Sequence, residues 1–531
     1  MSRIDYKLCI LAAGEGSRNT RYKNLHKALL PLGNRATIAR IIEIVPESVP
    51  VVIAVGYMKE QIKDYLAYTY PNRDIEFIDV ENYNGPGSGP GLSLFECRES
   101  LQCPFIFLGS DTLIDGAEND ITPDRNWIGV GNSSAWCDEA EVYCLYEQGR
   151  GFYYESWAQS TAQLNNCFIG VAGIRDYKKF WSNLETPTLI KGEHQVLNGF
   201  TELDDLRSME FKSWRDTGNN KSYRYTFGEY KNIVEPKPDE AIYIENKKVL
   251  KYFDDGEKVT NRVERGKQLL PNVPEVQKIS DHIYGYNYLS AIRFSDIRDV
   301  GLFDQFFAFV KSMYLDNIQE CDLEKFRNNC GKMYRGKTHS RVSSHPELKD
   351  LESVIKINGQ HVKSINSMLE SVDWDAIENK AVPVILHGDM SPENILYDTE
   401  NDRFTLIDWR DKFGDDLYLG DLYYDLCKLD HGLLVNGEIV RGQNYLVEVN
   451  GNEAHVEISV RTNLIDARKS LYKFCNDNDL DFEHVKLLTA LTLLNISSVH
   501  SDEKFNRFLF LYGKLLLKES LDVNRQLNSI I

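Results

Sequence analysis

Two short stretches of the chain combine residue types that suit phosphate chemistry. The first is LAAGEGSR, residues 11–18, in which Gly14 and Gly16 directly follow an apolar run. Glycine has no Cβ, so the backbone N–H groups of such a turn can approach a phosphate closely. Arg18 and Lys27 add cationic groups where the charge of a departing pyrophosphate would develop. This stretch predicts a cradle for a nucleoside triphosphate.

The second stretch is HGDMSPENIL, residues 387–396, followed by LIDWRD at 406–411. Phosphoryl transfer to a hydroxyl needs a carboxylate near the acceptor, and an Asn and an Asp that hold Mg²⁺ on the ATP phosphates. Asp389, Asn394 and Asp408 offer these groups in an H-x-D-x-x-x-x-N…D pattern. The pattern predicts a kinase site in a loop between two strands.

The elements around the first stretch alternate between strand and helix. Residues 6–115 contain the apolar runs KLCILAAG, VPVVIAVGY and PFIFLGSD, with helical patterns between them. Such alternation predicts βαβ units and a parallel sheet with helices on both faces. Ligands then bind at the carboxyl ends of the strands, where AAGEGSR and GSD fall.

A polar, proline-containing segment around residues 228–240 predicts a domain boundary, which we place between 1–232 and 233–531. Beyond it, AIYIENKKVLKYFDDG predicts a hairpin that turns at Asn246-Lys247, and EKVTNRVERGKQLL predicts a helix. Residues 444–460 predict an inserted hairpin with an Asn-Gly turn.

The composition narrows the class of protein. The 531 residues exceed one core, so two to four domains are expected, and 42% hydrophobic with 27% charged residues is ordinary for a globular protein. A net charge of −19 without a basic block argues against nucleic acid as a partner. We see no signal peptide and no membrane-spanning stretch, and the ten scattered cysteines have no zinc-motif spacing. We therefore expect a cytoplasmic protein with reduced cysteines.

Residues 8–33 resemble the signature of the nucleotidyltransferases that make nucleoside-diphosphate sugars and CDP-choline. FLGSD ends in Asp111, and WRDTGN, with Asp216, resembles the W-x-D-x-G-T motif of that family. The resemblance implies a Rossmann-like domain in which both aspartates bind Mg²⁺ and Arg18 and Lys27 are catalytic. It also implies that an NTP is bound by Ala12, Ala13, Gly14, Gly16 and, in the loop NYNGPGSGPGLSL, Gly89.

Two features depart from the pattern of that family. His26 stands where it usually has proline, and the segment FYYESWAQSTAQLNN lacks the lysine of the Glu-Lys-Pro that contacts a sugar phosphate in sugar-type members. Glu193 falls where some relatives have a Gly-Glu. The base of the NTP is left open.

Residues 387–411 resemble aminoglycoside phosphotransferases and choline kinases, which share a two-lobed, protein-kinase-like α+β fold. The resemblance implies that Asp389 is the catalytic base and that Asn394 and Asp408 bind Mg²⁺. His387 would support the loop, as would Asp421 and Asp425 in GDLYYDLCKL. Lys251 would pair with the ATP phosphates and Glu264 would be its helix partner. The N-lobe would span about 233–285 and the C-lobe about 286–531.

A kinase makes a phosphate monoester, and a nucleotidyltransferase consumes one. We therefore expect a bifunctional enzyme that phosphorylates a small sugar with ATP and couples the product to a second NTP, a pyrimidine one, with Mg²⁺ in each site. The W-x-D-x-G pattern favours a sugar phosphate, and such enzymes serve surface polysaccharide synthesis.

Two alternatives stay open. One is choline or another amino alcohol, because Trp409, Phe413, Tyr418, Tyr423 and Tyr424 could form a cation-binding aromatic box. The other is that one half is an inactive binding or regulatory module. The oligomeric state is not predicted.

Overall fold

The computed structural model describes residues 5–115, 121–132, 142–156, 164–186, 189–190, 192–230, 239–343, 346–500 and 502–528. The chain forms two compact units, one of residues 1–259 and 277–288 and the other of 260–276 and 289–531. The predicted boundary at residue 232 and the segment WAQSTAQ, residues 157–163, lie outside the described residues.

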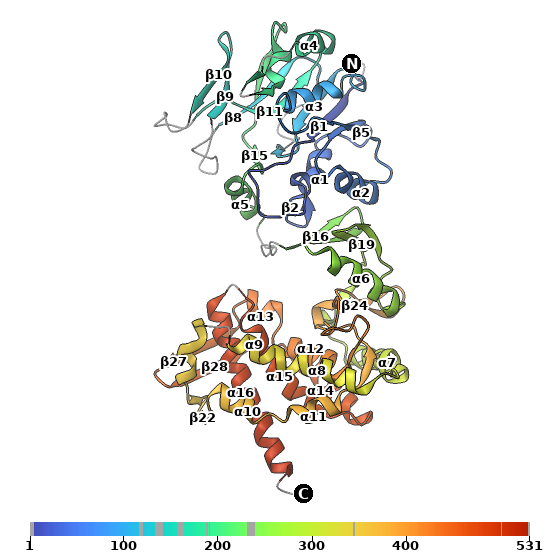
Figure 1. Cartoon of the computed structure of the whole chain (residues 1–531), viewed down its shortest axis with the longest axis vertical. Coiled ribbons are helices and arrows are strands. Elements are labelled where there is room, and N and C mark those ends of the chain that lie inside the picture. Colours follow the sequence, from blue (N-terminus) through green and yellow to red (C-terminus); the bar gives the residue numbers. More distant parts are fainter. Residues whose placement is uncertain are drawn as a thin grey trace. The chain divides into compact units, whose positions relative to one another are not determined.

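The first unit is built on one large sheet (Figure 1). β6, β1, β4 and β5 are parallel neighbours in that order, and β11 joins β6 in the antiparallel sense. β8 lies beside β11 and β14, and β9 and β10 extend the sheet as a hairpin. The strands are β1 (Lys7–Ala12), β4 (Val51–Val55), β5 (Ile75–Asp79), β6 (Phe105–Gly109), β8 (Trp127–Gly131), β9 (Val142–Glu147), β10 (Gly151–Ser156), β11 (Cys167–Ile174) and β14 (Arg207–Glu210).

Both faces of this sheet are buried, which explains why its strands are apolar throughout. Along β1, Leu8 and Ile10 face one hydrophobic core and Cys9 and Leu11 face the other. Helices α1 and α2 contribute to the first core, and α3 and α4 to the second. The predicted α/β architecture with a mostly parallel sheet is therefore confirmed. The helices are α1 (Thr37–Ile42), α2 (Lys59–Thr69), α3 (Pro90–Glu96), α4 (Tyr177–Leu184) and α5 (Asn220–Gly228).

Short strand pairs position the polar loops at the edge of this sheet. β7 pairs with β15, so that Thr112 lies opposite Asp216. The other two pairs are β2 with β3 and β12 with β13. These strands are β2 (Pro31–Leu32), β3 (Arg35–Ala36), β7 (Thr112–Leu113), β12 (Leu189–Ile190), β13 (Glu193–His194) and β15 (Arg215–Asp216).

A second, antiparallel sheet belongs to the same unit, with the strand order β16-β17-β19-β18. Its first hairpin turns at Asn246 and Lys247, both with positive φ, as predicted. Tyr243 and Tyr252 of this sheet are buried in the core that contains α1 and α2. The strands are β16 (Glu240–Glu245), β17 (Lys248–Phe253), β18 (Gln277–Ser280) and β19 (Ile283–Asn287).

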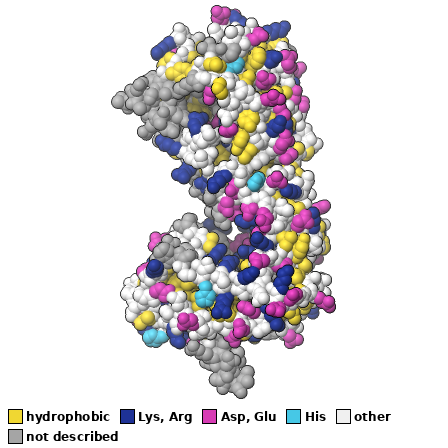
Figure 2. All heavy atoms as spheres, viewed as in Figure 1, with side chains coloured by type: hydrophobic (Ala, Val, Ile, Leu, Met, Phe, Trp, Pro, Cys, Tyr) yellow, Lys and Arg dark blue, Asp and Glu magenta, His cyan; other side chains and the backbone are white. Residues whose placement is uncertain are grey.

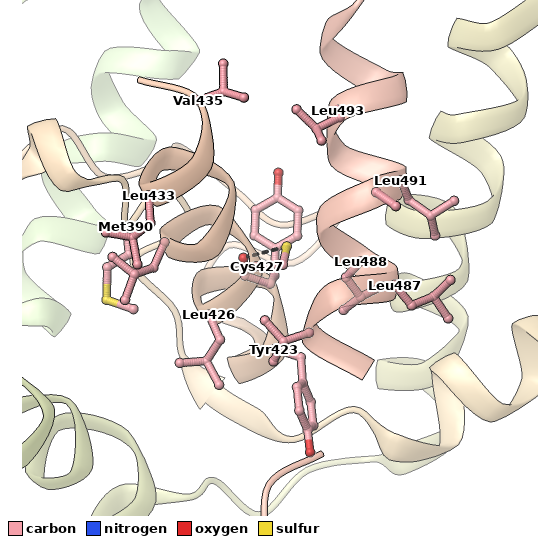
Figure 3. Close-up of a cluster of buried hydrophobic side chains, with 14 of the residues drawn as sticks. Met390, Tyr423, Leu426, Cys427, Leu433, Val435, Leu487, Leu488, Leu491 and Leu493 are labelled. Atoms are coloured by element: carbon pink, nitrogen blue, oxygen red, sulfur yellow. Dashed lines mark hydrogen bonds between the residues drawn. The ribbon is translucent and has the colours of Figure 1, made fainter. Parts of the chain in front are cut away.

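The second unit is mainly helical. The helix predicted at 257–270 is α6 (Gly256–Leu269). The inserted hairpin predicted at 444–460 is formed by β27 and β28, and β21 and β22 extend it to a four-stranded sheet. Figure 3 shows the tight packing of α12 on α15, where Tyr423, Leu426 and Cys427 lie near Leu487 and Leu488. The other helices are α7 (Val300–Tyr314), α8 (Leu323–Gly331), α9 (Lys337–Ser343), α10 (Ile365–Glu370), α11 (Trp374–Lys380), α12 (Leu422–Leu434), α13 (Gly437–Arg441), α14 (Thr462–Asp477), α15 (Phe482–Ile496) and α16 (Glu503–Asn528).

Two small sheets of this unit frame the HGDMSPENIL loop. β23 pairs with β26, and β24 pairs with β25 and β20, so the loop runs from β23 to β24. The strands of the unit are β20 (Ile292–Arg293), β21 (Lys356–Ile357), β22 (Gln360–His361), β23 (Pro383–Ile385), β24 (Ile395–Asp398), β25 (Arg403–Leu406), β26 (Leu419–Asp421), β27 (Tyr445–Asn450) and β28 (Glu453–Ile458).

The surface carries charges of both signs. On the face drawn in Figure 2, Asp and Glu side chains are interspersed with Lys and Arg, without one broad basic patch. None of the helices in the described ranges is both long and apolar enough to cross a membrane.

His484, at the start of α15, is a buried histidine outside the predicted sites. It is 4% exposed, and its ring lies edge-on to that of Tyr423 at 4.6 Å between centroids. Burial lowers the pKa of His484 to about 4, and the charge of Lys380 adds to the effect. A histidine that stays neutral when folded but protonates when unfolded stabilises the fold above its unfolded pKa.

We predict that the wild-type protein exceeds the His484→Gln variant in free energy of unfolding at pH 7, and that this difference becomes smaller as the pH falls. His484→Gln loses the ring contact at pH 7. Between pH 6.5 and 5 the unfolded wild-type chain takes up a proton that the folded chain does not, which removes about 2 kcal/mol of the difference. Urea unfolding of both proteins at pH 7 and 5, followed by a probe in the second unit, measures the gap. A gap that is constant or grows at pH 5 contradicts the prediction.

Candidate active sites

The turn after β1 holds Lys27 in place. Gly16 has a φ of +67°, and a Cβ on it would lie 2.6 Å from Cδ of Lys27. Gly16 therefore serves two needs: a left-handed backbone and space for the stem of the lysine. Any other residue here would displace Lys27.

His26 caps the short 3₁₀ turn (Lys27–Leu29) that carries this lysine. The backbone N–H of Ala28 donates to Nδ1 of His26 at 3.0 Å, and the N–H of His26 donates to Gln61. Burial, with the neighbouring charge of Lys27, lowers the pKa of His26 to about 3, so its ring stays neutral and can accept this bond. The imidazole thus gives a physical reason for His26 where the resembled family has proline.

Lys27 forms an ion pair with Asp111, which lies just beyond β6. Lys27 Nζ is 2.9 Å from Asp111 Oδ2, and both side chains are mostly buried. Burial alone would raise the pKa of Asp111, but the charge and hydrogen bond of Lys27 and the charge of Arg18 outweigh it and lower that pKa. Asp111 is therefore held ionised.

Asp216 meets Asp111 and Arg18 around Gly218. A Cβ on Gly218 would lie 3.1 Å from Asp216 Oδ1, 3.2 Å from Asp111 Oδ2 and 3.5 Å from Arg18 Nη2. Burial and the charge of Asp111 raise the pKa of Asp216 to about 6. The pairing of β7 with β15 brings these two carboxylates together from distant parts of the sequence.

The two carboxylates fit a divalent cation, because a cation relieves their repulsion and the burial of their charge. Within the described ranges no three His, Cys, Asp or Glu side chains gather as a metal site. Mg²⁺ commonly takes one or two protein carboxylates and completes its shell with phosphate oxygens and water. The donor set of Asp111 and Asp216 fits that pattern.

A cavity of about 550 Å³ opens beside these residues. It is lined by Ala13, Gly14, Gly16, Arg18, Lys27, Gly89 and Asp111 among others. Ala12, by contrast, is buried in the core. Gly89, with a φ of +124°, lets the loop at 82–94 pack against the backbone of His194, and Glu193 of β13 lines the cavity. The structure thus brings nearly all the predicted residues of this half to one cavity.

Asp389 in the second unit lies between two different partners. Its Oδ2 accepts a hydrogen bond from Nδ2 of Asn394 at 3.2 Å, and its Oδ1 is 2.7 Å from Nζ of Lys428. Burial raises the pKa of Asp389, but Lys428 more than compensates and lowers it. Sequence reasoning missed Lys428, although its place on the α12 helical pattern was a usable signal.

Asp425 holds the backbone of this loop. Its carboxylate accepts from the N–H groups of His387, Gly388 and Met390 at 2.9 to 3.2 Å. Asp421 does not: it caps α12 through Tyr423 and accepts from Val382 and Tyr334. The supporting role predicted for both aspartates is therefore observed for Asp425 only.

His387 and Asp408 connect the loop to β25. The Nε2 of His387 lies 3.0 Å from the carbonyl of Ile407, and the N–H of Ile407 donates to Asn394 at 2.9 Å. These contacts bring Asp408 to the strand end beside the loop, where it has a positive φ of +65°. Arg262 of α6 pairs with it, Nη1 to Oδ1, at 2.9 Å.

The pairing of Glu264 with Lys251 stays a prediction. Glu264 is on the outer side of α6 and pairs with Lys267 at 2.6 Å, with 43% of its side chain exposed. Arg262 and Arg265 of the same helix face inward instead, and Arg265 donates to the carbonyls of Leu386 and Leu417. Lys251 is buried in β17.

The aromatic residues near Asp408 do not form one box. Trp409 is buried and donates to the carbonyl of Arg262, and Tyr423 packs on His484. Tyr424 accepts from Arg410 at 3.1 Å, whereas Tyr418 is exposed. Phe413 packs edge-on against Tyr424 at 5.3 Å between ring centroids, so only part of the predicted aromatic cluster is drawn together.

Residues 339–432 match the phosphotransferase enzyme family (APH). This range contains Asp389, Asn394, Asp408 and Lys428. No curated protein matches the chain.

Solved structures similar to the N-terminal half include three that are named as nucleotidyl transferases. A CTP:phosphocholine cytidylyltransferase from Streptococcus pneumoniae is 21% identical, with 43% of this chain and 100% of that chain covered and a TM-score of 0.34. An inositol-1-phosphate CTP transferase from T. maritima is 14% identical over 44% of this chain and 98% of that chain, with a TM-score of 0.34. A protein assigned as a glucose-1-phosphate thymidylyltransferase from Bacillus anthracis is 15% identical, with the same coverage and TM-score. In the C-terminal part, the similarity to the phosphotransferase enzyme family (APH) covers residues 339–432.

Proposed function

We propose that the chain is a bifunctional enzyme that phosphorylates a small sugar with ATP and then joins the sugar phosphate to a nucleotide. One observation carries the proposal. Asp389, Asn394 and Asp408 lie in the region that matches a phosphotransferase family, and the N-terminal half has a separate pair of carboxylates, Asp111 and Asp216. The reactions are X–OH + ATP → X–OPO₃ + ADP + H⁺ and X–OPO₃ + NTP → NDP–X + PPi. The NTP is a pyrimidine nucleotide, and the product feeds surface polysaccharide synthesis.

In the kinase half, the acceptor hydroxyl attacks the γ-phosphorus as the bond to the ADP oxygen breaks. Asp389 accepts the hydroxyl proton, and its lowered pKa keeps it ionised for that task. Asn394 and Asp408 would hold Mg²⁺, which neutralises phosphate charge when it is bound. Asp425 fixes the loop backbone, and Lys251 is assigned to the ATP phosphates.

In the nucleotidyltransferase half, an oxygen of the sugar phosphate attacks the α-phosphorus of the NTP and pyrophosphate leaves. Arg18 and Lys27 bind the departing charge, and the turn at Gly14 and Gly16 admits the triphosphate. Asp111 and Asp216 would hold Mg²⁺. No protein nucleophile is required, because the two substrates react directly once they are aligned.

We predict that the two activities can be removed separately. Asp389→Asn lowers ATP-dependent phosphorylation by about 10²- to 10⁴-fold because the base is lost, but leaves pyrophosphate release from an NTP and added sugar phosphate. Asp111→Asn does the reverse. A panel of sugars and amino alcohols with ATP, NTPs and Mg²⁺ measures both reactions.

If either half is an inactive module, one of the two reactions is missing from the wild-type protein. Phosphorylation of choline but of no sugar overturns the sugar assignment.

A second prediction concerns the turn after β1. Gly16→Ala displaces the stem of Lys27 and lowers nucleotidyl transfer by about 10²-fold or more, as expected when a group that stabilises the transition state moves. Phosphorylation by the other half is unchanged. Gly228→Ala, with no atom within 4 Å of its added Cβ, is the matched control. Equal nucleotidyl transfer by the Gly16→Ala and control proteins would show that Lys27 does not depend on this glycine.

A further inference from the structure

α12 has two different faces. Tyr423 and Cys427 lie on the side of α12 that faces α15, in the hydrophobic core, as Figure 3 shows. Tyr424, Lys428 and His431 follow one another at intervals of four and three residues, so they share another face of the helix. The core contacts on the first face fix the direction of the second.

This second face borders Asp389. Lys428 lies 2.7 Å from Asp389 Oδ1. In the part of the chain that the structure describes, the two ring nitrogens of His431 are buried without a hydrogen-bond partner. Burial and the charge of Lys428 lower the pKa of His431 to about 3, against the opposing charge of Asp389, so the ring stays neutral. An imidazole with two buried, unpartnered nitrogens on the same helix face as Lys428 has hydrogen-bonding capacity for a ligand.

Arg410 adds a second cation. Its stem packs on Gly388, where a Cβ would lie 2.7 Å from Cβ of Arg410, and its Nη1 donates to the hydroxyl of Tyr424 at 3.1 Å. Burial would raise the pKa of Tyr424, but the charges of Arg410, Lys337 and Lys428 outweigh it and lower that pKa. These cations therefore act on one small region.

Two cations of α9 complete what we name the basic cluster, which consists of Lys337, Arg341, Arg410 and Lys428. Arg341 donates to the carbonyl of Asn495 at 2.9 Å. Burial lowers the pKa of Lys337, the charge of Tyr424 opposes that effect, and the charges of Arg410, Arg341 and Lys428 add to it. Asp389 and Asp411 are the carboxylates whose charges act on Arg410. The like charges of the cluster repel one another, and a bound anion relieves that repulsion.

An anion bound by the basic cluster would belong to the acceptor and not to ATP. Asp389 separates two sides of the site: one of its oxygens meets Asn394, on the side of Asp408 and the proposed Mg²⁺, and the other meets Lys428. Phosphates of ATP belong on the side of the metal ligands. The side of the basic cluster is then left to the compound whose hydroxyl Asp389 activates.

We propose that the acceptor of the kinase half carries an anionic group, a carboxylate or a phosphate ester, which the basic cluster and His431 bind. The inference rests on the proposed kinase function and narrows its substrate to sugar acids or sugar phosphates. The transfer itself is unchanged: the hydroxyl oxygen bonds to the γ-phosphorus, ADP leaves, Asp389 takes the proton, and the anionic group keeps its charge. Choline and other cationic acceptors are excluded by repulsion.

The test uses matched compounds that differ in charge: glucose, glucuronate and glucose 6-phosphate, then ribitol, ribonate and ribitol 5-phosphate, with choline as the cation. Phosphorylation with ATP and Mg²⁺ gives kcat/KM, and calorimetry without nucleotide gives binding to the full chain. We expect an anionic member to exceed its neutral match by about 10²-fold. The member of each series with the highest kcat/KM, the carboxylate or the phosphate ester, identifies the anionic group that the site prefers.

Two variants test the residues. Arg410→Met and Lys337→Met each raise the KM of the anionic acceptor by about 10- to 100-fold, the usual loss of a charge-assisted contact, and leave the KM of ATP unchanged. Arg403→Met removes an equally charged, exposed side chain of β25 and is the matched control. Lys337 lies on a different element, α9, so its variant also covers the case in which Arg410→Met fails to fold.

The outcomes separate the two claims. Equal or better use of neutral or cationic acceptors overturns the anionic acceptor but keeps the kinase. A rise in the KM of ATP alone also overturns it, because the cluster would then hold ATP. If both variants weaken the binding of an anion, the proposed binding site is supported, even when no compound is phosphorylated. The absence of phosphorylation would contradict the proposed kinase function instead. No binding and no turnover of any anionic member overturns the inference.

Discussion

Each candidate site contains a carboxylate whose pKa is lowered by a neighbouring lysine. Asp111 faces Lys27 and Asp389 faces Lys428, in two units with different folds. Without the lysine, burial would favour the protonated carboxyl, which can neither bind a metal ion nor accept a proton. The surrounding structure positions the lysine: Gly16 and His26 place Lys27, and the core face of α12 places Lys428.

The two halves reach this arrangement by different routes. In the first unit the cation is Lys27 in a loop, at the start of the capped 3₁₀ turn that follows the glycine turn, so the local backbone conformation determines its position. In the second unit a helix delivers it, and the packing of α12 on α15 decides which face meets the loop (Figure 3). When a loop positions a functional side chain, the residues that do so are close together in the sequence. When a helix positions it, the orientation depends on contacts with elements that are distant in the sequence.

This difference explains what could be predicted from the sequence. Gly16, Lys27, Asp389 and Asn394 lie in short motifs, so their grouping was predicted, as were the α/β sheet and the hairpin at Asn246-Lys247. Asp216 needed the register of β7 with β15, which only the resemblance supplied. The role of Glu264 stays a prediction, because the inward side of α6 is set by packing of residues such as Gly266 against Trp409. Lys428 was missed for the same reason.

The sheet β16–β19 has a consequence for how such a fusion can change in evolution. Its strand β16 donates the hydroxyl of Tyr243 to the carbonyl of Leu29, and Glu245 pairs with Arg35, so it braces the segment that carries Lys27. The strand next to it carries Lys251. A gene rearrangement that exchanged everything after residue 238 would therefore leave the nucleotide turn without its support. A replacement for the later part of the chain would have to reproduce these contacts for the turn at Lys27 to keep its support.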